Sequence, residues 1–177
     1  CAGQKVSLGF NDLATTNPTL ASEWHPIKNG DLKPTDVTKG SNKKVWWQCE
    51  RGHEWRTIVH HRSIGGNCPI CSGRQVLAGF NDLATQNPEL AAQWHPTQNG
   101  HLLPTDVTIG SDKKVWWQCG AGHGWNMPIY DRTMGRRCPY CARLKVLPGD
   151  NDLATTHPHL AKEWDFIEND PLTPNDV

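Results

Sequence analysis

The sequence has few apolar residues, no net charge and no long apolar run. Hydrophobic residues make up 36% of the 177 positions, whereas globular chains usually carry about 45–50%. Basic and acidic side chains number 18 each, so the overall charge does not call for a polyanionic partner. No apolar stretch approaches the roughly 18 residues that a transmembrane helix needs, so we expect none. No signal or transit peptide is visible, and because the chain begins with Cys1 we expect its true start further upstream.

A chain of this composition needs something other than a large hydrophobic core. It contains 16 glycines and 13 prolines, which favour frequent turns and short elements. Small units with a thin core are usually held together by a metal ion or by disulfides. Seven cysteines and nine tryptophans are the candidates for these two roles.

An internal repeat organises the chain. The segment Phe10–Thr15 recurs at 80–85 and, with Asp150 in place of Phe, at 150–155, an offset of 70 residues each time. Cys1 falls in register with Cys71 and Cys141, so we expect it to be the orphan ligand of a preceding site, with more repeats on both sides. The predicted boundaries are the tail of a preceding repeat (1–9), repeat 1 (10–79), repeat 2 (80–149) and the helical half of repeat 3 (150–177).

Local signals predict the elements of one repeat. Asn17 and Pro18 are typical of an N-cap followed by the first helical position, which predicts a helix of about two turns through Trp24. Residues 44–49 and 55–59 predict the two strands of a hairpin, less regular in repeat 2 because Pro128 interrupts the return. The predicted fold class is small α+β: tandem zinc-ribbon or treble-clef-like modules, each a short helix plus a β-hairpin around one zinc.

Cysteine and histidine recur at metal-ligand spacing. Two pairs per repeat, each within a short turn containing Gly or Pro, suit tetrahedral zinc, because one turn presents two ligands to one ion. The chain therefore predicts two complete Zn²⁺ sites. Their ligands are Cys49, His53, Cys68 and Cys71 in repeat 1, and Cys119, His123, Cys138 and Cys141 in repeat 2.

Three other interpretations of these residues stay open. A disulfide framework would leave Cys49 and Cys119 without partners in their own repeats. A catalytic Cys–His dyad would have no use for the paired cysteines, and iron is a further possible metal. His25 and His95 recur in Trp-His-Pro, but repeat 3 has Asp165 there, so we interpret them as residues at a helix C-terminus. His60, His61 and His101 do not recur and are not expected to be ligands.

Basic and aromatic residues around the predicted hairpins are candidates for partner binding. The metal-binding halves are basic and the helical halves carry the compensating acids, which favours contact with nucleic-acid phosphates. Tryptophans on both faces of a strand equally favour packing within a protein assembly. We therefore expect a non-catalytic module that binds nucleic acid or a larger protein assembly, and no small-molecule substrate. The candidate contact residues are Lys43, Lys44, Trp46, Lys113, Lys114, Trp116, Arg136 and Arg137.

The motifs together resemble a known family. Asn-Asp-Leu-Ala, Trp-His-Pro, Lys-Lys-Val-Trp-Trp-Gln-Cys, Gly-His and Cys-Pro-x-Cys occur in this order, a pattern similar to that of the probable zinc-ribbon, or treble-clef zinc-finger, domains. The resemblance implies the same eight ligands, zinc as the metal and tandem arrays. Some members accompany very-short-patch-repair-type endonuclease domains, which implies an accessory DNA-targeting module of a nuclease whose catalytic domain lies outside this sequence. Metal-bound thiolates predict a reducing intracellular compartment: cytosol, nucleus or an organelle matrix.

Overall fold

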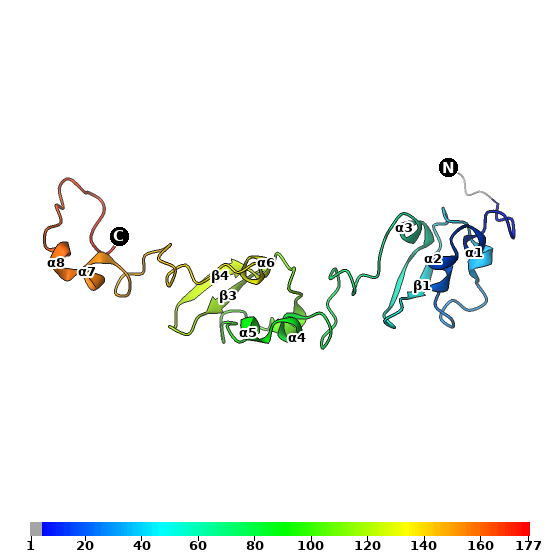
Figure 1. Ribbon diagram of the computed structural model, residues 1–177, viewed down its shortest axis with the longest axis horizontal. Helices are drawn as coiled ribbons and strands as arrows, with labels where there is room; N and C mark the ends of the chain where they lie inside the picture. Colours follow the sequence, from blue (N-terminus) through cyan, green and yellow to red (C-terminus); the bar gives the residue numbers. More distant parts are fainter. Residues whose placement is uncertain (1–4) are drawn as a thin grey trace. The chain divides into compact units, whose positions relative to one another are not determined.

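The computed structural model describes residues 5–177 as short helices and two β-hairpins (Figure 1). The chain divides into two compact units, one ending at Val76 and the other running from Leu77 to Val177. The predicted role of Cys1 falls outside the described residues. The small α+β class expected from the sequence is confirmed. Within the described part of the chain, no helix is long and apolar enough to cross a bilayer.

The first unit begins with two short helices, of which the second is the helix predicted after Asn17. They are α1 (Leu13–Thr16) and α2 (Pro18–Ser22). Asp12 caps α1 by accepting a hydrogen bond from the backbone N–H of Thr15 at 2.9 Å. Asn17 ends α1 and caps α2, and its φ of −150° breaks the helical path between them. The predicted N-cap Asn17 and first helical residue Pro18 are confirmed, but α2 ends at Ser22, two residues before the predicted end at Trp24.

The rest of the first unit is a turn, a hairpin and a third helix that the sequence did not predict. The elements are η1 (Pro34–Asp36), β1 (Lys44–Gln48), β2 (Glu54–Ile58) and α3 (Val59–Ser63). The strands pair antiparallel, with Trp47 opposite Trp55. The predicted second strand extended to Val59, but Val59 already belongs to α3. Because α3 follows β2 without a loop, it carries the chain from the hairpin toward the second cysteine pair.

The second unit repeats this order and adds the helical half of repeat 3. Its elements are α4 (Leu83–Gln86), α5 (Pro88–Ala91), η2 (Pro104–Asp106), β3 (Lys114–Gln118), β4 (Gly124–Pro128), α6 (Ile129–Thr133), α7 (Leu153–Thr156) and α8 (Pro158–Ala161). The expected irregularity of the return strand is not found. Pro128 occupies the terminal pair, opposite Lys114, and is also the N-cap of α6. Its missing N–H therefore removes no interior ladder bond.

Each hairpin buries one tryptophan-bearing face in a small core. Trp47 is fully buried, and the Trp24 ring packs edge-on against it with 5.4 Å between ring centroids. Burial alternates along β1, so that Trp46 lies on the partly exposed face, as the two-residue period of a strand predicts. Unit 2 has the same arrangement, with 5.5 Å between Trp94 and Trp117.

A buried arginine connects the three parts of each core. The Arg62 guanidinium on α3 lies 5.3 Å from both the Trp47 and the Trp55 ring. It also donates to the Glu23 carboxylate and to the Gly66 carbonyl, so it joins helix, hairpin and the following loop. In unit 2, Arg132 occupies this place with neutral Gln93 as its partner. Burial removes both arginines from the basic surface that the sequence indicates.

The helical half of every repeat closes on itself through the same backbone hydrogen bond. The N–H of Leu13 donates to the carbonyl of Val37 at 2.8 Å, and Leu153 donates to Val177 at 2.7 Å. The indole N–H of Trp164 donates to Leu172 at 3.3 Å, as Trp24 does to Leu32 at 3.0 Å. Repeat 3 forms these hydrogen bonds without a hairpin, so they follow from local sequence.

Candidate metal centre

The first ligand pair of unit 1 lies in the tight turn between β1 and β2. The N–H of Cys49 donates to the carbonyl of His53 at 3.1 Å, and the N–H of Gly52 donates to the carbonyl of Cys49 at 2.8 Å. Gly52 has a φ of +79°, in the left-handed region where a side chain would be strained. The turn therefore needs glycine at this position, and it places the Cys49 and His53 side chains on the same side.

The second ligand pair lies in a turn after α3. The N–H of Ser72 donates to the carbonyl of Cys68 at 3.0 Å, and Gly73 donates to Ile70 at 3.0 Å. These bonds curl the chain so that the Cys68 and Cys71 thiols face the first pair. Cys68 is buried and Cys71 is exposed, so the centre has one side in the core and one side at the surface.

All four ligand atoms converge in each unit, each within 4.8 Å of every other. In unit 1 the Cys49 and Cys71 sulfurs are 3.8 Å apart, and the His53 Nδ1 lies 3.6 Å from Cys49 and 3.2 Å from Cys71. A tetrahedral zinc with bonds of about 2.3 Å to sulfur and about 2.0 Å to nitrogen requires edges of about 3.8 Å for S···S and about 3.5 Å for N···S. The cluster therefore has the size of a zinc tetrahedron.

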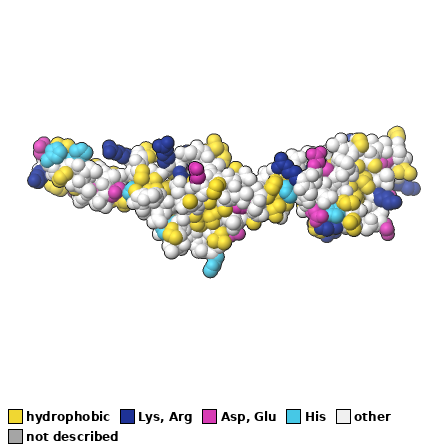
Figure 2. Space-filling view, turned by 60° about the horizontal axis from the view of Figure 1, so that its bottom comes forward, with side chains coloured by type: hydrophobic (Ala, Val, Ile, Leu, Met, Phe, Trp, Pro, Cys, Tyr) yellow, Lys and Arg dark blue, Asp and Glu magenta, His cyan; other side chains and the backbone are white. Residues whose placement is uncertain are grey.

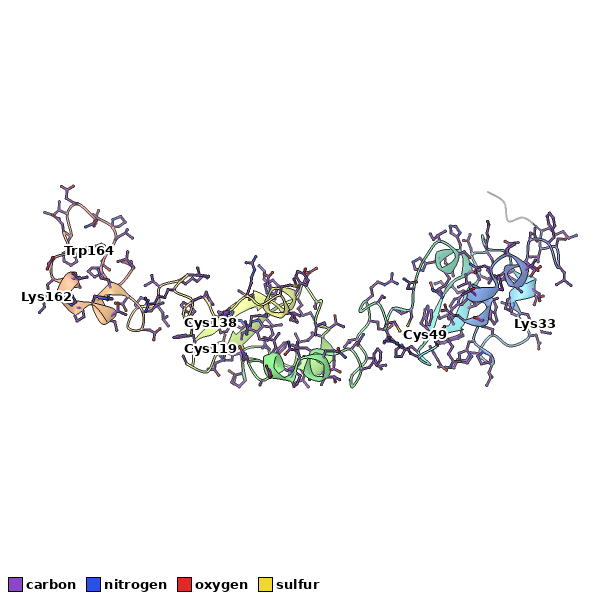
Figure 3. The ribbon with its side chains drawn as sticks, viewed as in Figure 1. Lys33, Cys49, Cys119, Cys138, Lys162 and Trp164 are labelled. Atoms are coloured by element: carbon purple, nitrogen blue, oxygen red, sulfur yellow. The ribbon has the colours of Figure 1, made fainter. Side chains whose placement is uncertain are left out.

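Unit 2 repeats the geometry closely. The Cys119–Cys141 sulfur separation is 3.7 Å, and the His123 Nδ1 lies 3.5 Å from Cys119, 3.2 Å from Cys141 and 3.6 Å from Cys138. Figure 3 shows the labelled Cys119 and Cys138 at the same end of the β3–β4 hairpin. The chain thus has two Cys₃His sites that can hold zinc, and in both the histidine presents Nδ1.

The ionisation of the thiols shows why a cation belongs there. Burial opposes ionisation of Cys119, but hydrogen bonds from the backbone of Ala121 and His123 and from the other thiols outweigh it and lower its pKa to about 7. Burial, together with the Cys119 and Cys138 sulfurs, raises the pKa of Cys141 to about 11. In unit 1 the pKa of Cys71 rises likewise to about 11. Without a cation the sulfurs cannot all be thiolates at neutral pH, and zinc supplies the missing positive charge.

A carboxylate supports the histidine of the second site. The Asp150 Oδ2 lies 2.8 Å from the His123 Nε2, the ring nitrogen that faces away from the cysteines. Carboxylates placed in this way fix the ring orientation and raise the basicity of a ligating histidine. Asp150 replaces the aromatic residue of the Phe-Asn-Asp-Leu motif, and sequence analysis did not assign it a role. The residue at that register after repeat 1 is Phe80, which has no carboxylate.

The alternatives to a metal centre fit the geometry less well. The six cysteines in the described part of the chain are free thiols. Three sulfurs surround one histidine nitrogen in each unit, whereas a Cys–His nucleophile needs a single thiol. Among the described residues, the clusters of three or more possible ligands consist of the two sets named above. His60, His61 and His101 belong to neither set.

The recurring His25 shapes a turn. Its Nδ1 accepts hydrogen bonds from the backbone of Ile27 and Lys28 at 3.2 and 3.1 Å. In repeat 3 the Asp165 carboxylate accepts the equivalent bonds from Ile167 and Glu168 at 2.9 and 3.1 Å. The two residue types interchange here because either can offer an acceptor to two successive N–H groups.

The candidate partner-binding residues lie mainly at the surface, where Figure 2 shows Lys and Arg side chains (dark blue) on both units. Lys43, Lys44, Lys113 and Lys114 are exposed at the starts of β1 and β3. Trp116 is 36% exposed, and Trp46 is partly buried with the Lys28 Nζ 4.9 Å from its ring centroid. Arg136 pairs with Asp131 at 3.7 Å, and Arg137 is exposed. The structure thus places the lysines together at the strand starts and leaves the arginines on the loop before the second cysteine pair.

Comparison with known proteins places this geometry in a family. A family described as "Probable Treble clef zinc finger domain" matches residues 20–74 and again 90–144, each match containing one complete ligand set. The chain belongs to this treble-clef zinc-finger family. The resemblance inferred from the motifs is confirmed, as are the expected tandem zinc-finger repeats and two sites fit for zinc. A curated relative from Escherichia phage T5, named "Putative endonuclease", is 26% identical over 102 residues, covering 56% of this chain and 32% of that protein. The chain thus spans about a third of the length of that relative.

Proposed function

We propose that this chain is a non-catalytic, zinc-stabilised module that binds nucleic acid. The observation that carries the proposal is a lysine pair at the start of each hairpin, Lys43–Lys44 and Lys113–Lys114. All four side chains are exposed, and the described residues offer them no carboxylate within ion-pair distance. Unpaired cations that recur at one register can each neutralise a phosphate and release counterions.

The wider role we propose is that of a targeting module in a nuclease. The relative named "Putative endonuclease" supports it, since the substrate of an endonuclease carries the phosphates that exposed lysines recognise. The catalytic groups would then lie in another part of the protein. We also propose a reducing intracellular location, because the exposed Cys71 and Cys141 ligands would be open to oxidation elsewhere.

A salt titration tests the nucleic-acid proposal. Binding of the zinc-loaded chain to a labelled oligonucleotide, followed by fluorescence anisotropy, should weaken steeply as salt rises, with a slope of about −0.7 to −0.9 per phosphate neutralised. Charge reversal of either lysine pair should weaken binding relative to the wild-type chain at the same salt concentration. The two variants are Lys43→Glu with Lys44→Glu, and Lys113→Glu with Lys114→Glu. A chain that binds no oligonucleotide at low salt, or binds with no salt dependence, would contradict the proposal.

A protein assembly is the second candidate, and one observation favours it. Phe10 and Ile27 are each 80% exposed, although both are large apolar side chains. Exposed residues of this kind are common at protein–protein contacts. Association through them should persist in high salt and weaken in Phe10→Ser with Ile27→Ser. Nucleic-acid binding should instead weaken in high salt and be unaffected by these two substitutions.

A further inference from the structure

Unit 1 has a basic groove alongside its hairpin. A hollow of about 540 Å³ lies between the strands and the second ligand turn, and its lining includes Trp46, Arg56, His61 and Arg74. A second hollow of about 520 Å³ shares Arg56 and His61 and adds Lys44. The two hollows adjoin at Arg56 and His61, and we refer to them together as the groove, which is large enough for parts of a nucleotide chain.

The positive charge of this groove is available to a ligand. The Arg56 side chain is exposed, and none of the described carboxylates lies within ion-pair distance of it. Arg74 is held in place without an acidic partner: its Nε donates to the Ser72 hydroxyl at 3.0 Å and its Nη2 to the Asn67 carbonyl at 2.9 Å. An arginine fixed by neutral acceptors keeps its full charge and loses little freedom on binding an anion.

The acid that lines the groove is already neutralised. Glu54 pairs with Lys28 and with the His25 Nε2, the latter at 2.8 Å. The Glu54 carboxylate is therefore engaged by an ammonium group and a ring nitrogen of its own unit. The remaining charge of the groove is therefore positive.

An aromatic wall accompanies the charge. The Trp46 indole lines the groove and lies on the less buried face of β1. Lys28 lies over its ring at 4.9 Å from the centroid, so one face is occupied and the rest of the ring borders the groove. Arginines that track phosphates beside an aromatic ring that takes a base are the recurring design for binding a single strand. A duplex hides the faces of its bases from such a ring.

The second unit carries other side chains at three registers of the groove. At the registers of Arg56, His61 and Arg74 it has Asn126, Asp131 and Leu144. Other lining positions change in the opposite sense, because Asn67 and Gln75 correspond to Arg137 and Lys145, and Glu54 corresponds to Gly124. The formal charge of the lining is therefore the same in both units, and its placement differs. The zinc ligands, the core tryptophans and the lysine pair are nevertheless all kept. The two repeats therefore share a scaffold and differ at this surface.

We infer that the groove of unit 1 binds an unpaired nucleic-acid strand, with Arg56 and Arg74 contacting its phosphates and Trp46 a base, and that unit 2, which lacks both arginines, does not bind the strand through these two registers. This inference rests on the proposed nucleic-acid function and assigns it to one repeat. The lysine pairs of both repeats attract the phosphates electrostatically, whereas the groove of unit 1 holds the strand in a defined position.

Substituting repeat 2 residues into repeat 1 tests the assignment. The variant Arg56→Asn with Arg74→Leu carries side chains that the same fold accepts in unit 2. With a labelled single-stranded DNA 20-mer and the zinc-loaded chain, affinity should fall at least tenfold, and the salt slope should become shallower by about 1 for each phosphate that is no longer neutralised. Trp46→Leu should weaken binding about tenfold and leave the salt slope unchanged, because stacking carries no charge.

A matched control distinguishes the effect of the groove residues on affinity from the effect of net charge. Lys33→Gln with Lys39→Gln removes two positive charges from positions of the same repeat outside the groove. Figure 3 labels Lys33 at the far end of unit 1 from Cys49. This control should lower affinity by less than about threefold. The reverse graft, Asn126→Arg with Leu144→Arg, should strengthen binding by creating the pair in unit 2. Zinc content and tryptophan fluorescence verify that each variant is folded.

The outcomes distinguish the two levels of the proposal. If the wild-type chain binds no oligonucleotide, the proposed function itself fails. If it binds, but the groove variant and the control reduce affinity equally, the groove assignment is overturned while nucleic-acid binding stands. A duplex of the same sequence is the last comparison. If it binds as tightly as the single strand or more tightly, and the groove variant lowers its affinity by the same factor, the single-strand assignment is overturned.

Discussion

Removal of Asp150 should weaken zinc binding at the second site and leave the first unchanged. The carboxylate accepts from the His123 Nε2 at 2.8 Å, a charge-assisted hydrogen bond that forms once Nδ1 holds the metal. Loss of such a supporting partner typically costs about 10–100-fold in metal affinity. The Asp150 side chain is 45% exposed, so water replaces part of the interaction and we expect the lower end. Asp150→Ala should therefore cost about tenfold, or about 1.4 kcal/mol.

Chelator competition on the full chain measures this effect. The zinc-loaded protein is titrated with a chromogenic chelator, and the release curve is fitted with two dissociation constants. Asp150→Ala should raise one constant and leave the other as an internal standard. Asp150→Asn should give an intermediate loss of affinity, because the amide oxygen still accepts the bond without the charge.

The control is Asp112→Ala, which removes another exposed carboxylate of unit 2 that is not among the ligands or their partners. It should leave both constants unchanged. The supporting role of Asp150 is refuted if Asp150→Ala changes neither dissociation constant, or if Asp112→Ala changes one of them as much. The first result would mean that Asp150 does not support the ligand, and the second would reduce its effect to net charge.

Three further outcomes follow from the fold. Zinc removal should abolish the near-ultraviolet circular dichroism of the buried tryptophans, because the binding free energy of a structural zinc is about 10–16 kcal/mol. An unchanged spectrum in the metal-free chain would contradict a structural role of the metal. Arg62→Met should destabilise unit 1 by about 3 kcal/mol in urea unfolding, because Glu23 loses its buried partner. Arg132→Met should cost less, because its partner Gln93 is neutral, and equal destabilisation would count against the ion pair. Asp12→Ala should cost about 1 kcal/mol because it removes the cap of α1, whereas a thermal midpoint equal to that of wild type would show that the cap contributes nothing.

The ligands could be predicted because they recur at fixed spacing within one chain, and the two-residue burial period of β1 followed from its sequence. The short helix α3 could not be predicted, since Ile58 offers no side-chain cap to its first turn. Its position depends on Arg62, whose guanidinium is buried against two indoles that the hairpin brings face to face across its strands. A charged residue gives no local sign that it will be buried.

The supporting role of Asp150 escaped prediction for a related reason. In the sequence it appears as a departure from the Phe-Asn-Asp-Leu motif, and only the folded chain shows which atom its carboxylate faces. The effect of Pro128 was misjudged because a strand terminus cannot be located to one residue from sequence. Predictions based on recurrence succeeded, whereas interactions between residues that differ among the repeats required coordinates.

The backbone bond that closes each helical half has a consequence for how the chain responds to metal supply. Because Leu153 and Val177 of repeat 3 join without a zinc ligand in this segment, this half of a repeat takes its shape without its own metal site. Metal depletion would then melt the hairpins and spare the segments between them. Each ion would be taken up or given back within a single repeat, so that occupancy would follow the free zinc concentration gradually, repeat by repeat.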